Sequence, residues 1–120
     1  MIMGNDYSCR CCGKGTITPE TLAALEKLEA AYEKPLKVTS AYRCRKHNAR
    51  VGGKEFSAHL FGLAVDVAVP WRQAQFCAMA KACGFTVAIP YAEKGFCHLA
   101  LASSRECKKR FGKITETVIG

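Results

Sequence analysis

Three side chains in the second half of the chain are of the types that bind zinc: His59, Asp66 and His98. Six residues separate His59 from Asp66, and His98 follows in Gly95-Phe-Cys-His. Two imidazoles and one carboxylate leave one position of a tetrahedral zinc ion open for water. A water held there can lose a proton near neutral pH and attack a carbonyl. The set therefore predicts a site for one zinc ion that is suited to hydrolysis.

Two predicted strands must bring these ligands together. Residues 63–69 alternate so that valines occupy one strand face while Asp66 lies between alanines on the other. His59 precedes this strand in a glycine-flanked loop, and Gly62 allows the loop to curl back so that His59 and Asp66 converge. In a last strand over residues 96–101, His98 occupies alternate positions with Phe96 and Ala100 and could face the same metal.

The other elements follow from periodicity and from proline and glycine positions. Thr18 before Pro19 predicts a helix start, and leucines recur at helical spacing until Pro35. The remaining predictions are an irregular segment 1–17, a strand 36–40, a helix or turn 43–50, a helix 71–83, a strand 85–89, a loop 90–95 and a basic tail 103–120. Because no regular strand-helix-strand repeat is present, we expect one α+β domain over residues 1–120, with a mainly antiparallel sheet flanked by helices.

The net charge of +8 would draw the protein towards a polyanion such as nucleic acid, an anionic membrane surface or an acidic cell-wall polymer. Apart from 105–110 the basic residues are scattered, without a recognition helix or aromatic stacking strand, so we expect no nucleic-acid partner. No apolar stretch approaches the roughly 20 residues of a membrane span. The N-terminus does not resemble a secretory signal. We expect a monomer synthesised in the cytoplasm without a signal peptide.

Eight cysteines permit either disulfides or free thiols. Without a signal peptide the default compartment is reducing, where buried cysteine behaves as a small apolar residue. Cys9, Cys11 and Cys12 are close enough to hold a metal or to bridge to Cys44 or Cys107. They lack the paired C-x-x-C spacing of a zinc knuckle, so their spacing disfavours a second metal.

Several motifs recur along the chain in a recognisable order and spacing. They are Thr39-Ser-Ala-Tyr-Arg43, His47-Asn48, Val51-Gly-Gly53, Ser57-x-His59-x-x-Gly62-x-Ala64-x-Asp66, Gly84-Phe85 and Gly95-Phe-x-His98. Their order and spacing closely resemble the zinc D-alanyl-D-alanine carboxypeptidase family, which includes phage endolysins and a hedgehog-related fold. The resemblance covers about residues 7–101 and implies a compact α+β domain, zinc held by His59, Asp66 and His98, and hydrolysis of peptide bonds in the peptidoglycan stem.

The resemblance also implies a role for Arg43, which similar enzymes place against the substrate near zinc. A guanidinium suits this role because it donates two parallel hydrogen bonds to a carboxylate or a developing oxyanion. Ser57 either binds near the first metal ligand, which would place it at the substrate, or only caps the loop. His47 and Asn48 are predicted to be structural, with Asn48 suited to a turn before the glycines.

The chain departs from the family at the group that moves the proton. Related enzymes commonly carry an acidic residue three positions before the last zinc histidine, or a His or Asp two positions from it. Here these positions hold Gly95, Phe96 and Ala100, and none of them can move a proton. The nearest candidate for the general base is Glu93, on the loop five residues before His98.

The leading hypothesis is a zinc-dependent peptidoglycan peptidase, either a carboxypeptidase or an endopeptidase. It would suit a phage lysin that acts at the bacterial cell wall. The runner-up is a binding module that keeps zinc but has lost hydrolysis, favoured by the missing acid. A third hypothesis, a secreted domain held by disulfides without metal, depends on the cysteines alone.

Overall fold

The computed structural model describes residues 7–119, with side chains described to residue 112. Four strands form one antiparallel sheet in the order β1-β2-β4-β3, which confirms the predicted α+β class. In chain order the elements are α1 (Pro19–Tyr32), β1 (Val38–Ser40), α2 (Arg45–Arg50), the 3₁₀ helix η1 (Ala58–Phe61), β2 (Ala64–Ala68), α3 (Gln73–Ala82), β3 (Val87–Tyr91), the 3₁₀ helix η2 (Ala92–Lys94), β4 (Phe96–Ala100) and α4 (Ser104–Ile119).

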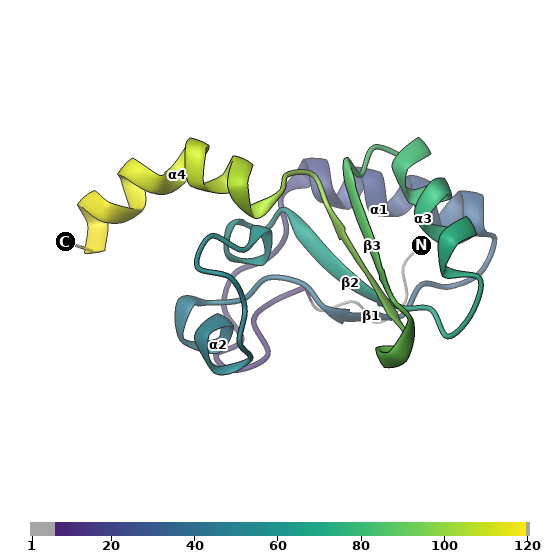
Figure 1. The fold of residues 1–120 in the computed structure, drawn as a ribbon, viewed down its shortest axis with the longest axis horizontal. Coiled ribbons are helices and arrows are strands. Elements are labelled where there is room, and N and C mark those ends of the chain that lie inside the picture. The colour runs from purple at the N-terminus through teal and green to yellow at the C-terminus, as the bar shows by residue number, and fades with distance from the viewer. Residues whose placement is uncertain (1–6, 120) are drawn as a thin grey trace.

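The two faces of the sheet differ in what they carry. Val65 and Val67 of β2 are directly opposite Leu99 and Cys97 of β4, and all four belong to a core completed by α1 and α3. Figure 1 shows both helices running along the sheet. Because side chains alternate along a strand, the intervening positions of β2 and β4 face away from this core. Asp66 is one of these positions, as the alternation of residues 63–69 predicts.

The first helix forms as its sequence predicts. The Thr18 hydroxyl accepts a hydrogen bond from the Thr21 amide at 3.2 Å, and Pro19 occupies the first turn, where no amide donor is needed. Leu25 and Leu28 are fully buried in the main core. The helix therefore packs one apolar stripe against the sheet.

Gly62 sets the turn between η1 and β2. Its φ of +70° is left-handed, and a Cβ there would lie 2.7 Å from the Thr16 carbonyl oxygen. The Gly62 carbonyl also accepts hydrogen bonds from the Thr18 amide and the Thr21 hydroxyl. A glycine is thus required where the chain doubles back between His59 and Asp66.

Some boundaries differ from the sequence expectations. The loop predicted over 90–95 is shorter, because β3 continues through Tyr91 and η2 follows. Within residues 103–120, expected as a tail of uncertain structure, α4 spans Ser104–Ile119. Cys107 on α4 is buried in a second small core with Ala58 and Ala100, and Phe111 stacks on Phe61. Figure 1 shows the C-terminal part of α4 extending away from the sheet.

Candidate metal centre

The three predicted metal ligands converge on one point. Asp66 and His98 are directly opposite each other in the pairing of β2 with β4. Oδ1 of Asp66 lies 3.0 Å from Nδ1 of His98 and 3.2 Å from Nε2 of His59. One ligand atom from each of the three residues lies within 4.8 Å of the others. This is the donor set that the sequence predicts for zinc, brought together by one strand pair and one turn.

The hydrogen bond of His59 to the backbone shows how this donor set fits a cation. Its Nδ1 lies 2.6 Å from the Ala41 carbonyl oxygen, so Nδ1 carries the proton. In a neutral ring, Nε2 is then an acceptor facing the carboxylate oxygen of Asp66. Two acceptors 3.2 Å apart require a cation between them, either a second proton or a metal ion. His59 is therefore oriented as a metal ligand whose other nitrogen is fixed by a backbone carbonyl.

Asp66 is only 5% exposed and is held in its charged form. Burial acts to raise its pKa, but hydrogen bonding and electrostatic interactions with His59 and His98 outweigh burial and hold the pKa well below its usual range. A carboxylate that stays ionised in a buried position is ready to ligate a cation.

Arg43 fixes the other oxygen of the same carboxylate. Its Nη2 donates to Asp66 Oδ2 at 3.2 Å, while Nε donates to Ser40 Oγ at 3.2 Å and Nη1 to Asn48 Oδ1 at 3.3 Å. The Arg43 backbone amide also donates to the His59 carbonyl at 3.1 Å. Arg43 thus lies beside the metal ligands, with two of its five N–H groups outside these contacts.

Asn48 and Gly53 hold Arg43 in place. The sequence predicted only a helix or turn over residues 43–50, and Asn48 lies in the helix α2. Besides accepting from Arg43, the Asn48 side chain donates to the Lys54 carbonyl at 2.8 Å. A Cβ at Gly53 would overlap the Asn48 amide group. The structural role predicted for Asn48 is confirmed, and the glycine pair beside it was the available signal for close packing.

The ligands lie in a cavity of about 340 Å³. Among the described residues that line it, the cationic side chains are Arg43, Lys54 and Lys94, and the only acidic one is Asp66. Ser57 also lines the cavity, and its hydroxyl accepts from the His59 amide at 3.3 Å, so it caps η1. Glu93 is exposed on η2 and is not among the lining residues. The cavity is thus predominantly positive around the candidate metal position.

The sequence matches the family model described as Peptidase M15 over residues 4–100. The chain belongs to the peptidase M15 family. A search among curated proteins finds no significant match. M15 peptidases are zinc enzymes, and the convergence of His59, Asp66 and His98 gives this chain a group that fits the ion. The M15 match thus identifies a zinc metallopeptidase, and it covers nearly the same residues as the resemblance found from the motifs.

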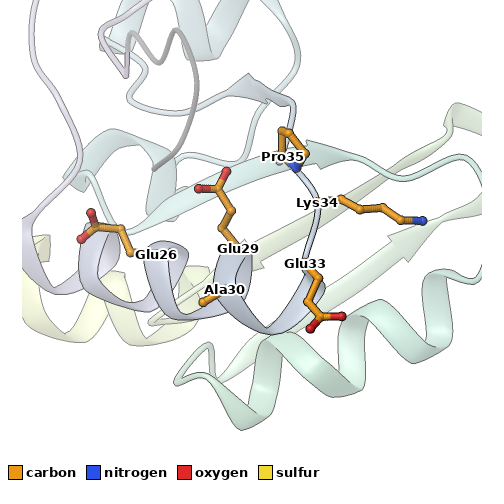
Figure 2. A pocket seen from close by; sticks show the side chains of 6 residues that line it. All are labelled: Glu26, Glu29, Ala30, Glu33, Lys34 and Pro35. Atoms are coloured by element: carbon orange, nitrogen blue, oxygen red, sulfur yellow. The ribbon is translucent and has the colours of Figure 1, made fainter.

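A second hollow, of about 330 Å³, lies at the C-terminal end of α1 and is lined mainly by charged side chains (Figure 2). Figure 2 shows the carboxylates of Glu26 and Glu33 pointing in different directions. Of the described residues, these glutamates are not among the groups whose ligand atoms converge on one point. The cavity that holds His59, Asp66 and His98 is therefore the candidate for the metal site of an M15 peptidase, called here the M15 site. Every helix of the described part of the chain is too short or too polar to cross a membrane.

Proposed function

We propose that this M15 protein hydrolyses peptide bonds in peptidoglycan stem peptides, as a D-Ala-D-Ala carboxypeptidase or as an endopeptidase of the endolysin type. The observation that carries the proposal is the donor set of two histidines and one aspartate in the cavity beside Arg43. A zinc ion held by His59, Asp66 and His98 would supply a Lewis acid for the scissile carbonyl and lower the pKa of a water in its open position.

The cavity suits an extended peptide that ends in, or carries, a carboxylate. Ile89 and Tyr91 are exposed, line the cavity and belong to β3, which is an edge strand of the sheet. An edge strand offers backbone groups to an extended chain, and apolar side chains beside it provide contact area. The cations Lys54 and Lys94 line the same cavity and favour an anionic substrate.

Arg43 is proposed to bind the substrate carboxylate or the developing oxyanion. Its contacts with Ser40, Asn48 and Asp66 fix the plane of the guanidinium, so the remaining N–H groups point in defined directions. A donor that is already oriented loses little conformational freedom when charge develops on the carbonyl oxygen. Ser57, on the cavity wall beside His59, is proposed as a further substrate contact.

Glu93 is proposed as the general base that takes a proton from the attacking water and passes it to the leaving amine. It lies on η2, next to Lys94, which lines the cavity. Its exposed position requires that η2 move Glu93 towards the cavity when substrate binds. The positive surface would favour binding to anionic wall polymers, and a lysin of this kind would act at the bacterial cell wall as a monomer.

A zinc-containing binding module is the second candidate, and the position of Glu93 outside the cavity lining favours it. Ala100, at one family position for a proton-transferring residue, is fully buried. Such a module would bind wall peptides without turnover.

The two candidates are separated by digesting purified sacculi with the protein as prepared, after chelation, and after zinc is restored. Chelator-sensitive release of D-Ala identifies a carboxypeptidase, and new amino termini without D-Ala identify an endopeptidase. Neither product, from protein with zinc at this site and bound to sacculi, identifies the binding module.

A further inference from the structure

Four cysteine side chains lie together beside the N-terminus of α2, where Cys44 is the N-cap. None of them is a ligand of the M15 site. Cys9, Cys11, Cys12 and Cys44, called here the cysteine cluster, have their four sulfur atoms within 4.8 Å of one another. Cys11 Sγ lies 3.3 Å from Cys44 Sγ and 3.6 Å from Cys9 Sγ. The sequence left open whether Cys44 or Cys107 is the distant partner of the first three cysteines. The structure brings Cys44 to them, while Cys107 is buried in the second small core.

We propose that the cysteine cluster binds a structural zinc ion, separate from the zinc of the M15 site. In a tetrahedral Cys₄ site with Zn–S bonds of about 2.3 Å, neighbouring sulfurs lie about 3.8 Å apart. The separations of 3.3 and 3.6 Å are slightly shorter than this value, and all four sulfurs lie within 4.8 Å of one another before any ion is placed. Four thiolates close the coordination shell, so such an ion has no open position and its role is structural.

The backbone around the cluster orients the sulfurs as ligands. The Cys44 amide donates to Cys9 Sγ at 3.4 Å, and the His47 amide donates to Cys44 Sγ at 3.4 Å. A tight turn closed by the Gly13 amide on the Cys9 carbonyl, at 2.8 Å, brings the first three cysteines together. Amides that point at sulfur fix the ligands and stabilise negative charge on them. The spacing of Cys9, Cys11 and Cys12 is not that of a zinc knuckle, but the turn brings these three cysteines together and Cys44 supplies the fourth sulfur.

A disulfide would engage only two of the four sulfur atoms of the cysteine cluster. All eight cysteines are free in the structure. A bond between Cys11 and Cys44 would leave the thiols of Cys9 and Cys12 crowded against it. One zinc ion engages all four sulfurs and joins the N-terminal segment to the residue that follows Arg43. In a small domain, such a cross-link contributes directly to folding stability.

The test is zinc per chain in folded, full-length protein purified under reducing conditions. Wild type should hold two zinc ions, Cys11→Ser and His59→Ala one each, and the double variant none. Cys11 is exposed, so its replacement disturbs little packing. Cys83→Ser is the matched control because Cys83 lies outside both ligand groups, and it should keep two zinc ions. The His59→Ala protein should also melt at a higher temperature with its remaining zinc than after chelation.

Cobalt replacement gives a second measurement that does not require the cysteine variant to fold. Cobalt in the His59→Ala protein should show sulfur-to-metal charge-transfer absorption, since only the cysteine cluster then holds metal. The proposal would be overturned if this absorption were absent, or if the purified protein held iron in place of zinc. It would also be overturned if titration of the chelated, denatured, unreduced protein found six thiols rather than all eight. These readouts do not depend on peptidase activity, so a failure of the proposed function leaves them unchanged.

Discussion

The guanidinium of Arg43 lies 3.2 Å from Oδ2 of Asp66, while both histidines contact Oδ1 of the same carboxylate. One buried carboxylate thus connects the arginine expected at the substrate with the ligands expected at the metal. Because the two groups share Asp66, the position of Arg43 relative to the metal ligands is fixed by direct contact rather than by the intervening loop.

Arg43→Lys should therefore lower kcat/KM about 10²- to 10³-fold, the usual cost of losing an oxyanion donor. A lysine ammonium is a single charged point and cannot contact Ser40, Asn48 and Asp66 in one plane as the guanidinium does. The measurement is kcat/KM on a stem peptide with excess zinc present. Arg45→Lys, at an exposed position, is the control and should behave as wild type. An unchanged kcat/KM in Arg43→Lys would exclude the proposed role.

Asp66→Asn should remove the zinc of the M15 site and abolish turnover. The substitution keeps the shape of the side chain but removes the negative charge that faces two imidazoles and Arg43. Zinc content and hydrolysis of sacculi should fall together, and Glu20→Gln, which removes an exposed carboxylate on α1, should change neither. Full turnover in Asp66→Asn would show that the metal, if required, is held elsewhere.

Gly53→Ala should displace Arg43 indirectly, through the side chain of Asn48. The added Cβ overlaps the side-chain amide of Asn48, which must move and release Arg43 Nη1. We expect a loss of about 1–3 kcal/mol in the free energy of unfolding, typical of overpacking, together with a lower kcat/KM. Chemical denaturation and kinetics measure the two effects. Gly112→Ala is the comparison, because its Cβ meets only ordinary contacts. Wild-type stability in Gly53→Ala would show that this turn relaxes freely.

The turnover of Glu93→Gln tests whether Glu93 acts as the general base of a peptidase, as the first proposed function requires. If Glu93 is the general base, turnover should fall about 10²- to 10⁴-fold while zinc content stays the same. The pH profile of kcat should also lose the limb that reports ionisation of the base. Glu55→Gln, at another exposed carboxylate, is the matched control. If Glu93→Gln and wild type hydrolyse sacculi at the same rate, the base must be another group.

Local pattern was sufficient for much of the fold. The helix beginning after Thr18, the strand around Asp66 and the strand around His98 follow from capping and periodicity, which act between residues close in sequence. The same pattern placed Asp66 on the face away from the valines. The end of the chain was harder to predict, because α4 carries mostly polar residues. Its start does have a local signal: the Glu106 amide donates to Ser103 Oγ at 3.1 Å and the Ser103 amide donates to Glu106 Oε1 at 3.2 Å, which is a capping box.

What the sequence by itself determined about this protein is the donor set of His59, Asp66 and His98 and the strands that carry it. Only the tertiary structure decided that Asp66 faces His98 in register, that the Ala41 carbonyl orients His59, and that Cys44 joins three cysteines near the N-terminus. Each of these contacts joins residues at least 18 positions apart. They depend on strand register and chain packing, which no local pattern encodes, since a shift of one residue would turn every side chain of a strand to the opposite face.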